Sequence, residues 1–434
     1  MSLKVIELND NALRVGDESG ILVESPGFAL AVENKKLILG EAAKQQARIH
    51  PTNSYNRYWH ELSIDPLNQT AGIRHFADIA YAHLLHLAEA GEIDGDVIFA
   101  VPGNFTRAHL AILLGLVNQS PFRTAGLVDS ALAAVSSTKL DLELDSYVYA
   151  ELQLHQVVLT KIAVDDGILK RESVIQVPGV GSQNFMDLMM QLATDLFIQQ
   201  CRFNPQHDAE SEQQLYNALP SWLQQDDGNQ NSLLLELTAN TAVHTAKMPR
   251  ESLISNLSGH YKSIGQQVAE LAAVGNSKLL LSPEFAELPG FHSYLSEGIK
   301  ITLLPVDAIS KSVFQNRASI IRGDEQVELV TKLAKIANTV KAIDKRALKV
   351  AAKAGKVATH VLIGSTAIPL ACADLPKQLG RIEKHDEAFY LDSGKQEFLL
   401  NQLKVAGKHA IGLDDLIQCS EGSEAIRLIQ VSNG

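Results

Sequence analysis

The stretch DVIFAVPGNF, residues 96–105, predicts a β-strand that ends just before a helix. Its first half is almost entirely apolar, and Pro102-Gly103 then interrupts the strand, because proline has no N–H to offer a neighbouring strand. Thr106 stands at a helix N-cap position, and the residues after it predict a helix through Leu116. A strand followed at once by a helix is typical of an α/β sheet.

Two hairpins are expected before this strand. The first joins residues 2–8 to 12–15 through the polar triplet at 9–11, whose Asn and Asp residues favour a tight turn. The second joins 28–32 to 37–39. Together with the strand at 96–101, they indicate a mixed sheet instead of a simple alternation of parallel strands and helices.

The pattern continues on the C-terminal side of that strand, and the two halves resemble each other weakly. Apolar periodicity predicts helices at 72–90, 129–136, 182–201 and 247–271, two strands joined by a tight turn at 147–162, and a strand at 278–281 followed by a loop at 282–290. In each half a hairpin precedes longer strands and a helix. The expected fold class is therefore α/β.

The bulk composition excludes several classes of protein. A chain of 434 residues predicts two or three domains. The net charge of −12 argues against general nucleic-acid binding, which needs a basic face. No window approaches the roughly 20 apolar residues of a membrane span. The three cysteines lie far apart, so buried reduced thiols are expected, in a cytoplasmic protein without a signal peptide.

Seven segments resemble, in the correct order, the ATPase domain of DnaK-type heat-shock chaperones. They are residues 40–54, 101–105, 126–134, 147–162, 181–185, 249–253 and 279–289. The resemblance covers residues 2–305 and implies the actin/heat-shock-chaperone ATPase-like fold, with two lobes that close around a nucleotide cleft.

The phosphate-binding hairpins of that family are degenerate in this chain. Family members hold phosphates on glycine-rich turns, since backbone N–H groups approach a phosphate closely only where no Cβ intervenes. Here the turns contain no glycine, and Glu7 and Glu151 replace the family's aspartates. Asp10 would face a triphosphate, and a like-charge contact at about 4 Å costs on the order of a few kcal/mol. Glu7 and Glu151 could hold a metal in a remodelled cleft, but we expect solvated acids at the hairpin tips.

The other positions of the resemblance are also altered. Trp59 matches the catalytic lysine, Asp129 the bridging glutamate, and Pro283-Glu284 the double glycine of the adenosine loop. We therefore expect no catalytic residue, no metal and no cofactor. Trp59 is either a binding anchor or, as we expect, a packing aromatic residue, and His155 is expected to be a surface or turn residue instead of a base.

The C-terminal third begins with a basic segment. Residues 329–350 carry apolar side chains at helical spacing between lysines, which predicts a helix with a solvated basic face; an acidic-partner or membrane-surface helix is the alternative. The strands after it resemble a forkhead-associated (FHA) domain over about 357–431, on the segments at 363–364, 398–401 and 413–417. That resemblance implies a small all-β sandwich.

The phosphothreonine-reading arginine of FHA domains is missing. Ser365 stands in its place, and Lys377 and Arg381 offer only point charges nearby. These three residues and Asn401 are the candidate partner-binding residues, and the protein partner is expected to bind without phosphorylation.

These observations predict a pseudo-ATPase domain (1–324), a helical linker (325–356) and an FHA-like domain (357–434). The favoured function is a non-catalytic, chaperone-like scaffold or adaptor that binds another protein. The alternative is a divergent chaperone-family protein that binds or hydrolyses ATP with magnesium.

Overall fold

The computed structural model divides the chain into two compact units, Met1–Ile336 and Ala337–Gly434. The structure describes residues 3–32, 36–67, 73–141, 144–165, 167–224, 231–239, 242–273, 275–295, 299–321, 327–334, 358–363, 366–370, 381–385, 388–400, 403–411, 413, 415–418 and 426–429. Within these residues the fold is α/β, with ten α-helices and several sheets, one of them a C-terminal antiparallel sheet.

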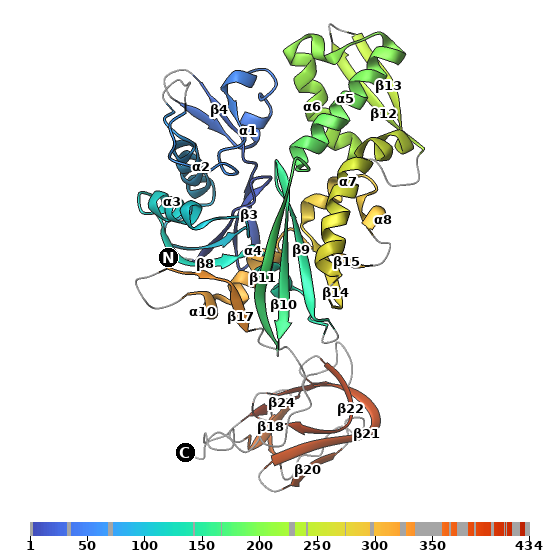
Figure 1. Cartoon of the computed structure of the whole chain (residues 1–434). Helices are drawn as coiled ribbons and strands as arrows, with labels where there is room; N and C mark the ends of the chain where they lie inside the picture. Colours follow the sequence, from blue (N-terminus) through green and yellow to red (C-terminus); the bar gives the residue numbers. More distant parts are fainter. Residues whose placement is uncertain are drawn as a thin grey trace. The chain divides into compact units, whose positions relative to one another are not determined.

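The first unit contains a six-stranded sheet in the order β16-β8-β7-β1-β2-β3, of which Figure 1 labels β8 and β3. The first three strands along the chain form an antiparallel meander, and β7, β8 and β16 extend the sheet in parallel from β1. The strands are β1 (Lys4–Glu7), β2 (Leu13–Asp17), β3 (Gly20–Ser25), β7 (Asp96–Val101), β8 (Arg123–Asp129) and β16 (Leu329–Val330).

A second six-stranded sheet repeats this arrangement, in the order β15-β14-β9-β10-β11-β17. Its meander β9-β10-β11 is antiparallel, and β14 and β15 continue in parallel from β9. Only the last strands differ, because β17 pairs antiparallel with β11. The strands are β9 (Ser146–Leu152), β10 (Gln156–Asp165), β11 (Ile168–Pro178), β14 (Ser277–Leu281), β15 (Lys300–Leu303) and β17 (Lys332–Ala334).

One hydrophobic core joins the two sheets. Apolar residues of both sheets pack there with α4 (Ser130–Ser137) and α9 (Ala308–Gln315). The outer face of the first sheet packs against α2 (Phe76–Ala90) and α3 (Arg107–Val117). The outer face of the second sheet packs against α5 (Ser182–Cys201), α6 (Ala209–Gln224) and α7 (Arg250–Ala272). Each fully buried Leu, Ile or Phe in these cores contributes about 1.5–3 kcal/mol of transfer free energy.

Smaller elements complete the first unit. Besides the two main sheets, the unit has a three-stranded sheet in the order β5-β4-β6 and a two-stranded sheet of β12 and β13. The elements are β4 (Ala29–Ala31), β5 (Leu37–Leu39), β6 (Ser54–Tyr55), β12 (Ser232–Ala239), β13 (Ala242–Pro249), α1 (Glu41–Lys44), α5 (Ser182–Cys201), α6 (Ala209–Gln224), α7 (Arg250–Ala272), α8 (Phe291–Leu295), α10 (Arg317–Ile320) and the 3-10 helices η2 (Pro51–Asn53), η3 (Pro205–His207) and η4 (Pro283–Glu287).

The second unit is built on one antiparallel sheet of seven strands. Alternate residues of these strands, among them Val361, Phe398 and Leu428, form its own core. The strands are β18 (His360–Ile363), β19 (Thr366–Pro369), β20 (Arg381–His385), β21 (Ala388–Leu400), β22 (Leu403–Ile411), β23 (Leu416–Gln418) and β24 (Ile426–Ile429). The sheet agrees with the strands predicted at the C-terminus, and the closer likeness to an FHA sandwich stays a prediction.

Several local predictions are confirmed. The hairpins and the helix at 182–201 are present, and Thr106 caps α3, with the His109 N–H donating to Thr106 Oγ1 at 3.2 Å. The helix predicted from residue 247 begins only at Arg250, because the residues before Pro249 pair as strand β13.

The predicted helix at 329–350 is wrong in its first turns, which are the strands β16 and β17. Leu329 and Val330 pair with β8, and 332–334 pair with β11. Val330 and Leu333 are buried in the core between the sheets. The helical spacing was misleading here because these residues form hydrogen bonds with the edge strands β8 and β11. Such long-range pairing outweighs the local preference for a helix. Residues 335–350, with the rest of the predicted linker up to 356, lie outside the described residues.

Candidate functional site

The tips of the β1–β2 and β9–β10 hairpins bind each other directly. Asn9 Nδ2 donates to the Leu152 carbonyl at 3.1 Å, and the Leu154 N–H donates to Asp10 Oδ1 at 2.8 Å. Asn9, Asp10, Leu152 and Leu154 are all buried. The two turns, more than 140 residues apart in sequence, therefore form one hydrogen-bonded unit, which we call the hairpin lock.

The start of helix α5 joins the hairpin lock. Ser182 Oγ donates to Asn11 Oδ1 at 2.5 Å, and the N–H groups of Ser182 and Gln183 donate to the carbonyls of the second turn at 2.9 Å. Gly181 precedes the helix, and a Cβ there would lie 2.3 Å from the Leu154 carbonyl oxygen. The close approach of helix and turn thus depends on glycine at this position.

Asp10 is a buried carboxylate with one unused oxygen. Its side chain is buried, and Oδ2 has no hydrogen-bond partner among the described residues. Burial raises the pKa of Asp10 to about 7, although the Leu154 N–H acts in the opposite direction. Asp10 therefore changes charge close to neutral pH.

A second polar cluster is organised by Arg14, the second residue of strand β2. Its Nη2 donates to Glu284 Oε1 at 2.6 Å, its Nε to Glu24 Oε2 at 2.7 Å, and its Nη1 lies 3.6 Å from Glu7 Oε1. Arg14, Glu7 and Glu284 are almost wholly buried, whereas the Glu24 side chain is half exposed. One guanidinium thus pairs with carboxylates of the first sheet and with one from η4, which follows the second sheet's strand β14.

The expectation that Glu7 and Glu151 are solvated is wrong, because both are buried, at 4% and 3% exposure. Burial raises the pKa of Glu7 to about 7, against the lowering effect of Arg14. Burial also raises the pKa of Glu151 well above its usual value, and Ser130 Oγ donates to Glu151 Oε2 at 3.0 Å. Glu7 is the last residue of β1 and Glu151 the last but one of β9, so both stand at the C-terminal ends of central strands.

Asp129 has a structural role at the start of helix α4. Its Oδ1 accepts the Ala131 N–H at 2.9 Å, and its Oδ2 accepts a hydrogen bond from Arg171 Nη1 at 2.8 Å. Burial raises the pKa of Asp129, and the Arg171 guanidinium partly offsets this rise. The carboxylate therefore caps a helix and pairs with a cation, with both oxygens occupied.

Trp59 belongs to a buried network around His83. The Trp59 indole N–H donates to His83 Nδ1 at 3.3 Å, the Tyr58 hydroxyl lies 2.7 Å from the same nitrogen, and Ser25 Oγ lies 2.8 Å from Nε2. An indole N–H can only donate, so Nδ1 is unprotonated and Nε2 carries the hydrogen. His83 therefore donates to Ser25 and cannot act as its base, and burial lowers its pKa to about 3.

His155 lies in the turn of the second hairpin, as expected, but it is buried. Its Nε2 donates to the Asn56 carbonyl at 3.0 Å, and burial lowers its pKa to about 4. Within the described residues, no group of three or more His, Cys, Asp or Glu side chains could hold a metal ion.

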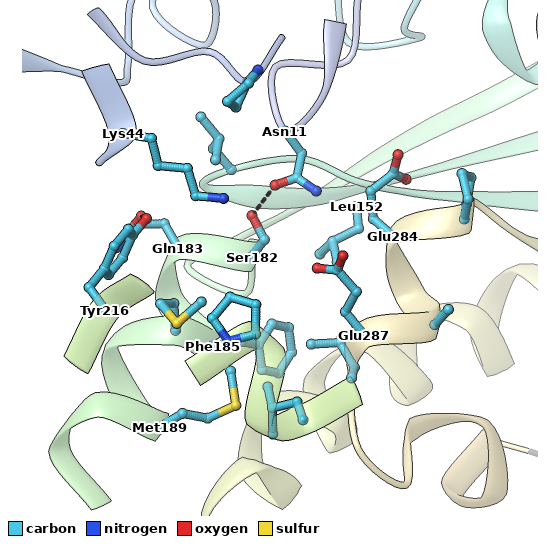
Figure 2. A pocket seen from close by; sticks show the side chains of 18 of the residues that line it. Asn11, Lys44, Leu152, Ser182, Gln183, Phe185, Met189, Tyr216, Glu284 and Glu287 are labelled. Carbon is cyan, nitrogen blue, oxygen red and sulfur yellow. Dashed lines mark hydrogen bonds between the residues drawn. The ribbon is translucent and has the colours of Figure 1, made fainter. Parts of the chain in front are cut away.

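A cavity of about 400 Å³ opens beside the hairpin lock (Figure 2). Its polar lining comes from segments far apart in sequence: Asn11, Lys44, Ser182, Glu284 and Glu287. Its apolar lining is mainly from helices α5 and α6 and includes Phe185, Met186, Met189 and Leu223. Pro283 and Glu284, the predicted adenosine-loop positions, form one wall, and Asp10, Trp59 and Asp129 are not among the lining residues.

The predicted partner-binding residues of the second unit are mostly outside the described residues, namely Ser365, Lys377 and Asn401. Arg381 is described: it is the first residue of β20, and it is exposed. The structure thus places one of the four at an exposed strand end. Among the cysteines, Cys201 is a free thiol, and the other two lie outside the described residues.

Four residues of the site are not among the residues predicted from the sequence: Arg14, Lys44, Ser182 and Glu287. Arg14 had a signal, because a charged residue between Leu13 and Val15 in a strand buried on both faces needs buried partners. The other three are ordinary polar residues at element ends, and only the fold brings them to one cavity.

Among the described residues, no helix has both the length and the apolar character needed to cross a membrane. No protein-family model matches this chain, and no curated protein sequence matches it either.

Proposed function

We propose that residues 1–324 form an actin/heat-shock-chaperone ATPase-like, two-lobed pseudo-ATPase, and that the chain is a non-catalytic scaffold or adaptor that binds another protein. The repeated sheet topology supports this proposal, since each half contributes a meander followed by parallel strands. The seven ordered sequence segments support it independently. Each half would be one lobe, with the hairpin lock at the place where the family binds phosphates.

The observation that carries the proposal is the hydrogen bond from the Leu154 N–H to Asp10 Oδ1. A phosphate on such a turn needs free backbone N–H groups. The N–H of Leu154 is already bound by a carboxylate of the same protein, and those of Ser182 and Gln183 are bound by turn carbonyls. A triphosphate would have to displace Asp10, and an ionised Asp10 would repel it.

The remaining positions of the nucleotide cleft serve the fold. Glu284 pairs with Arg14, Asp129 pairs with Arg171, and Trp59 is buried with His83. The charged groups at these three positions are paired or buried within the protein, so they are not free to hold the phosphates or the metal of a nucleotide. We propose that the chain acts through its surfaces, and that the C-terminal FHA-like domain contributes to partner binding without recognising phosphothreonine.

The test is the melting temperature of the nucleotide-free protein with millimolar ATP or ADP, with and without magnesium. A ligand at 100 times its Kd stabilises a protein by about 2.7 kcal/mol, which is visible as a shift of several degrees. We expect no shift relative to magnesium alone. A reproducible ATP-dependent shift would contradict the proposal and support the divergent ATP-binding chaperone instead.

A further inference from the structure

The cavity beside the hairpin lock has charged groups of opposite sign that face the same space. Lys44 ends helix α1, Glu287 ends η4, and both line the cavity. Figure 2 shows the Lys44 side chain and the Glu287 carboxylate directed toward the region beside Ser182. The lining therefore offers a cationic and an anionic contact in one chamber.

Partial burial raises the pKa of Glu287 and the Lys44 ammonium lowers it, so the two charges act on each other without forming a close ion pair. Within the described residues, Glu287 makes no hydrogen bond or ion pair, and Lys44 Nζ approaches only Glu41, at 3.9 Å and near the surface. Glu284 also lines the cavity, but its Oε1 accepts a hydrogen bond from Arg14 and its Oε2 is fully buried. Glu287, which is exposed, is therefore the carboxylate that a ligand in the cavity can reach.

The opposite wall is apolar and adaptable. Phe185, Met186 and Met189 on α5 face Leu223 at the end of α6 and Leu288 after η4. Methionine side chains fit irregular apolar surfaces well. The volume of about 400 Å³ lies within the range of roughly 300–1,000 Å³ that is usual for small-molecule pockets.

We propose that this cavity binds a small zwitterion with a bulky apolar side chain, namely a free hydrophobic α-amino acid. Its ammonium group contacts the Glu287 carboxylate, its carboxylate contacts the Lys44 ammonium, and its side chain packs on Phe185 and the methionines. A simple amine would leave Lys44 without a partner, and a simple carboxylate would leave Glu287 without one. An uncharged nucleoside would satisfy neither charge.

The first experiment is calorimetry on the full chain with L-phenylalanine, L-leucine and L-methionine. Three analogues remove one feature each: 2-phenylethylamine lacks the carboxylate, 3-phenylpropionate lacks the ammonium, and glycine lacks the side chain. We expect at least one of the three amino acids to bind, and every analogue to bind about tenfold or more weakly, since charge-assisted contacts and apolar burial each contribute that much.

Substitutions of the lining residues test whether the amino acid binds in this cavity. Glu287→Gln and Lys44→Met remove one charge each, and we expect each to weaken binding about tenfold. Glu89→Gln and Lys170→Met are the matched controls, because they make the same changes at exposed positions outside the cavity lining. Leu223→Trp keeps both charges but fills the chamber from a half-buried position, so it should abolish binding while the protein still melts cooperatively.

Several results would overturn the proposal: no heat with any of the three amino acids at millimolar concentration, an analogue that binds as tightly as its parent, or cavity variants that bind like the controls. Adenosine binding in their place would also overturn it. Amino-acid binding goes beyond the proposed pseudo-ATPase function. The two proposals can be refuted separately, because an ATP-dependent melting shift would refute the pseudo-ATPase without changing any of the amino-acid binding results.

Discussion

The two hairpin tips occupy equivalent places in the two six-stranded sheets, yet they contribute opposite chemistry. The tip at 9–11 presents side-chain oxygens and an amide, whereas the tip at 153–155 presents mainly its backbone. An acceptor from one half therefore meets a donor from the other. A repeated topology with unlike turns can lock together without any ligand between the halves.

The two halves also differ in the charged residues that they contribute to the Arg14 cluster. The first sheet contributes Arg14, Glu7 and Glu24, and the second half contributes Glu284 from η4. The carboxylates outnumber the single guanidinium, and burial raises the pKa of Glu7 to about 7, so Glu7 can hold a proton close to neutral pH. The hairpin lock and the Arg14 cluster are thus two separate ties between the halves, and variants can break each one alone.

Replacing Arg14 should have the largest effect. Arg14→Leu leaves Glu284 and Glu7 buried without their cation, and breaking a buried ion pair in this way typically costs about 3–5 kcal/mol. The loss should be greater at pH 8 than at pH 6, since Glu7, whose pKa burial raises to about 7, can take up a proton at the lower pH. Urea unfolding at both pH values measures it. Arg123→Leu removes an exposed pair with Asp96 and should cost less than about 1 kcal/mol. Equal losses in the two variants would refute the role assigned to Arg14.

Breaking the hairpin lock should have an intermediate effect. Asp10→Ala leaves the Leu154 N–H buried without an acceptor, for a loss of about 1–3 kcal/mol. Asp10→Asn keeps the Oδ1 acceptor and should lose less than half as much. Chemical denaturation gives both values, with Asp94→Ala as the exposed control. If Asp10→Asn is as unstable as Asp10→Ala, the hydrogen bond is not what holds the turns together.

The smallest expected effect is the pH dependence due to Glu7. Its pKa rises from 4.5 to about 7 on folding, so the native state keeps a proton that the unfolded chain has released. The contribution of Glu7 to the free energy of unfolding is therefore largest below about pH 4.5, and it decreases as the pH rises toward 7. Glu7→Gln should gain roughly 1–2 kcal/mol relative to the wild type between pH 5 and pH 8.

Denaturation curves of Glu7→Gln and the wild type across this pH range provide the measurement. Glu18→Gln, at an exposed position, is the matched control and should follow the wild type at every pH. Asp10 titrates in the same direction and is present in all three proteins, so it cancels in the difference. A constant difference between Glu7→Gln and the wild type would show that Glu7 does not titrate in this range.

Sequence patterns were most informative where a residue's neighbours along the chain decide its structure. The triplet at 9–11, the cap at Thr106 and the apolar period of 182–201 each depend on contacts within a few residues, and each was predicted correctly. The pattern at 329–334 failed for the converse reason. Its partners are strands more than 100 residues earlier, and the same apolar residues fit a helix equally well in isolation.

The sequence by itself determined that this chain is α/β, that its two hairpin turns have no glycine, and that an acid stands in the first of them. Only the tertiary structure decided what that acid does: Asp10 binds the opposite turn instead of facing solvent or a phosphate. The same holds for Glu7, Glu151 and Arg14. Burial and pairing are set by which segments the fold brings together, and a single sequence does not specify those long-range contacts.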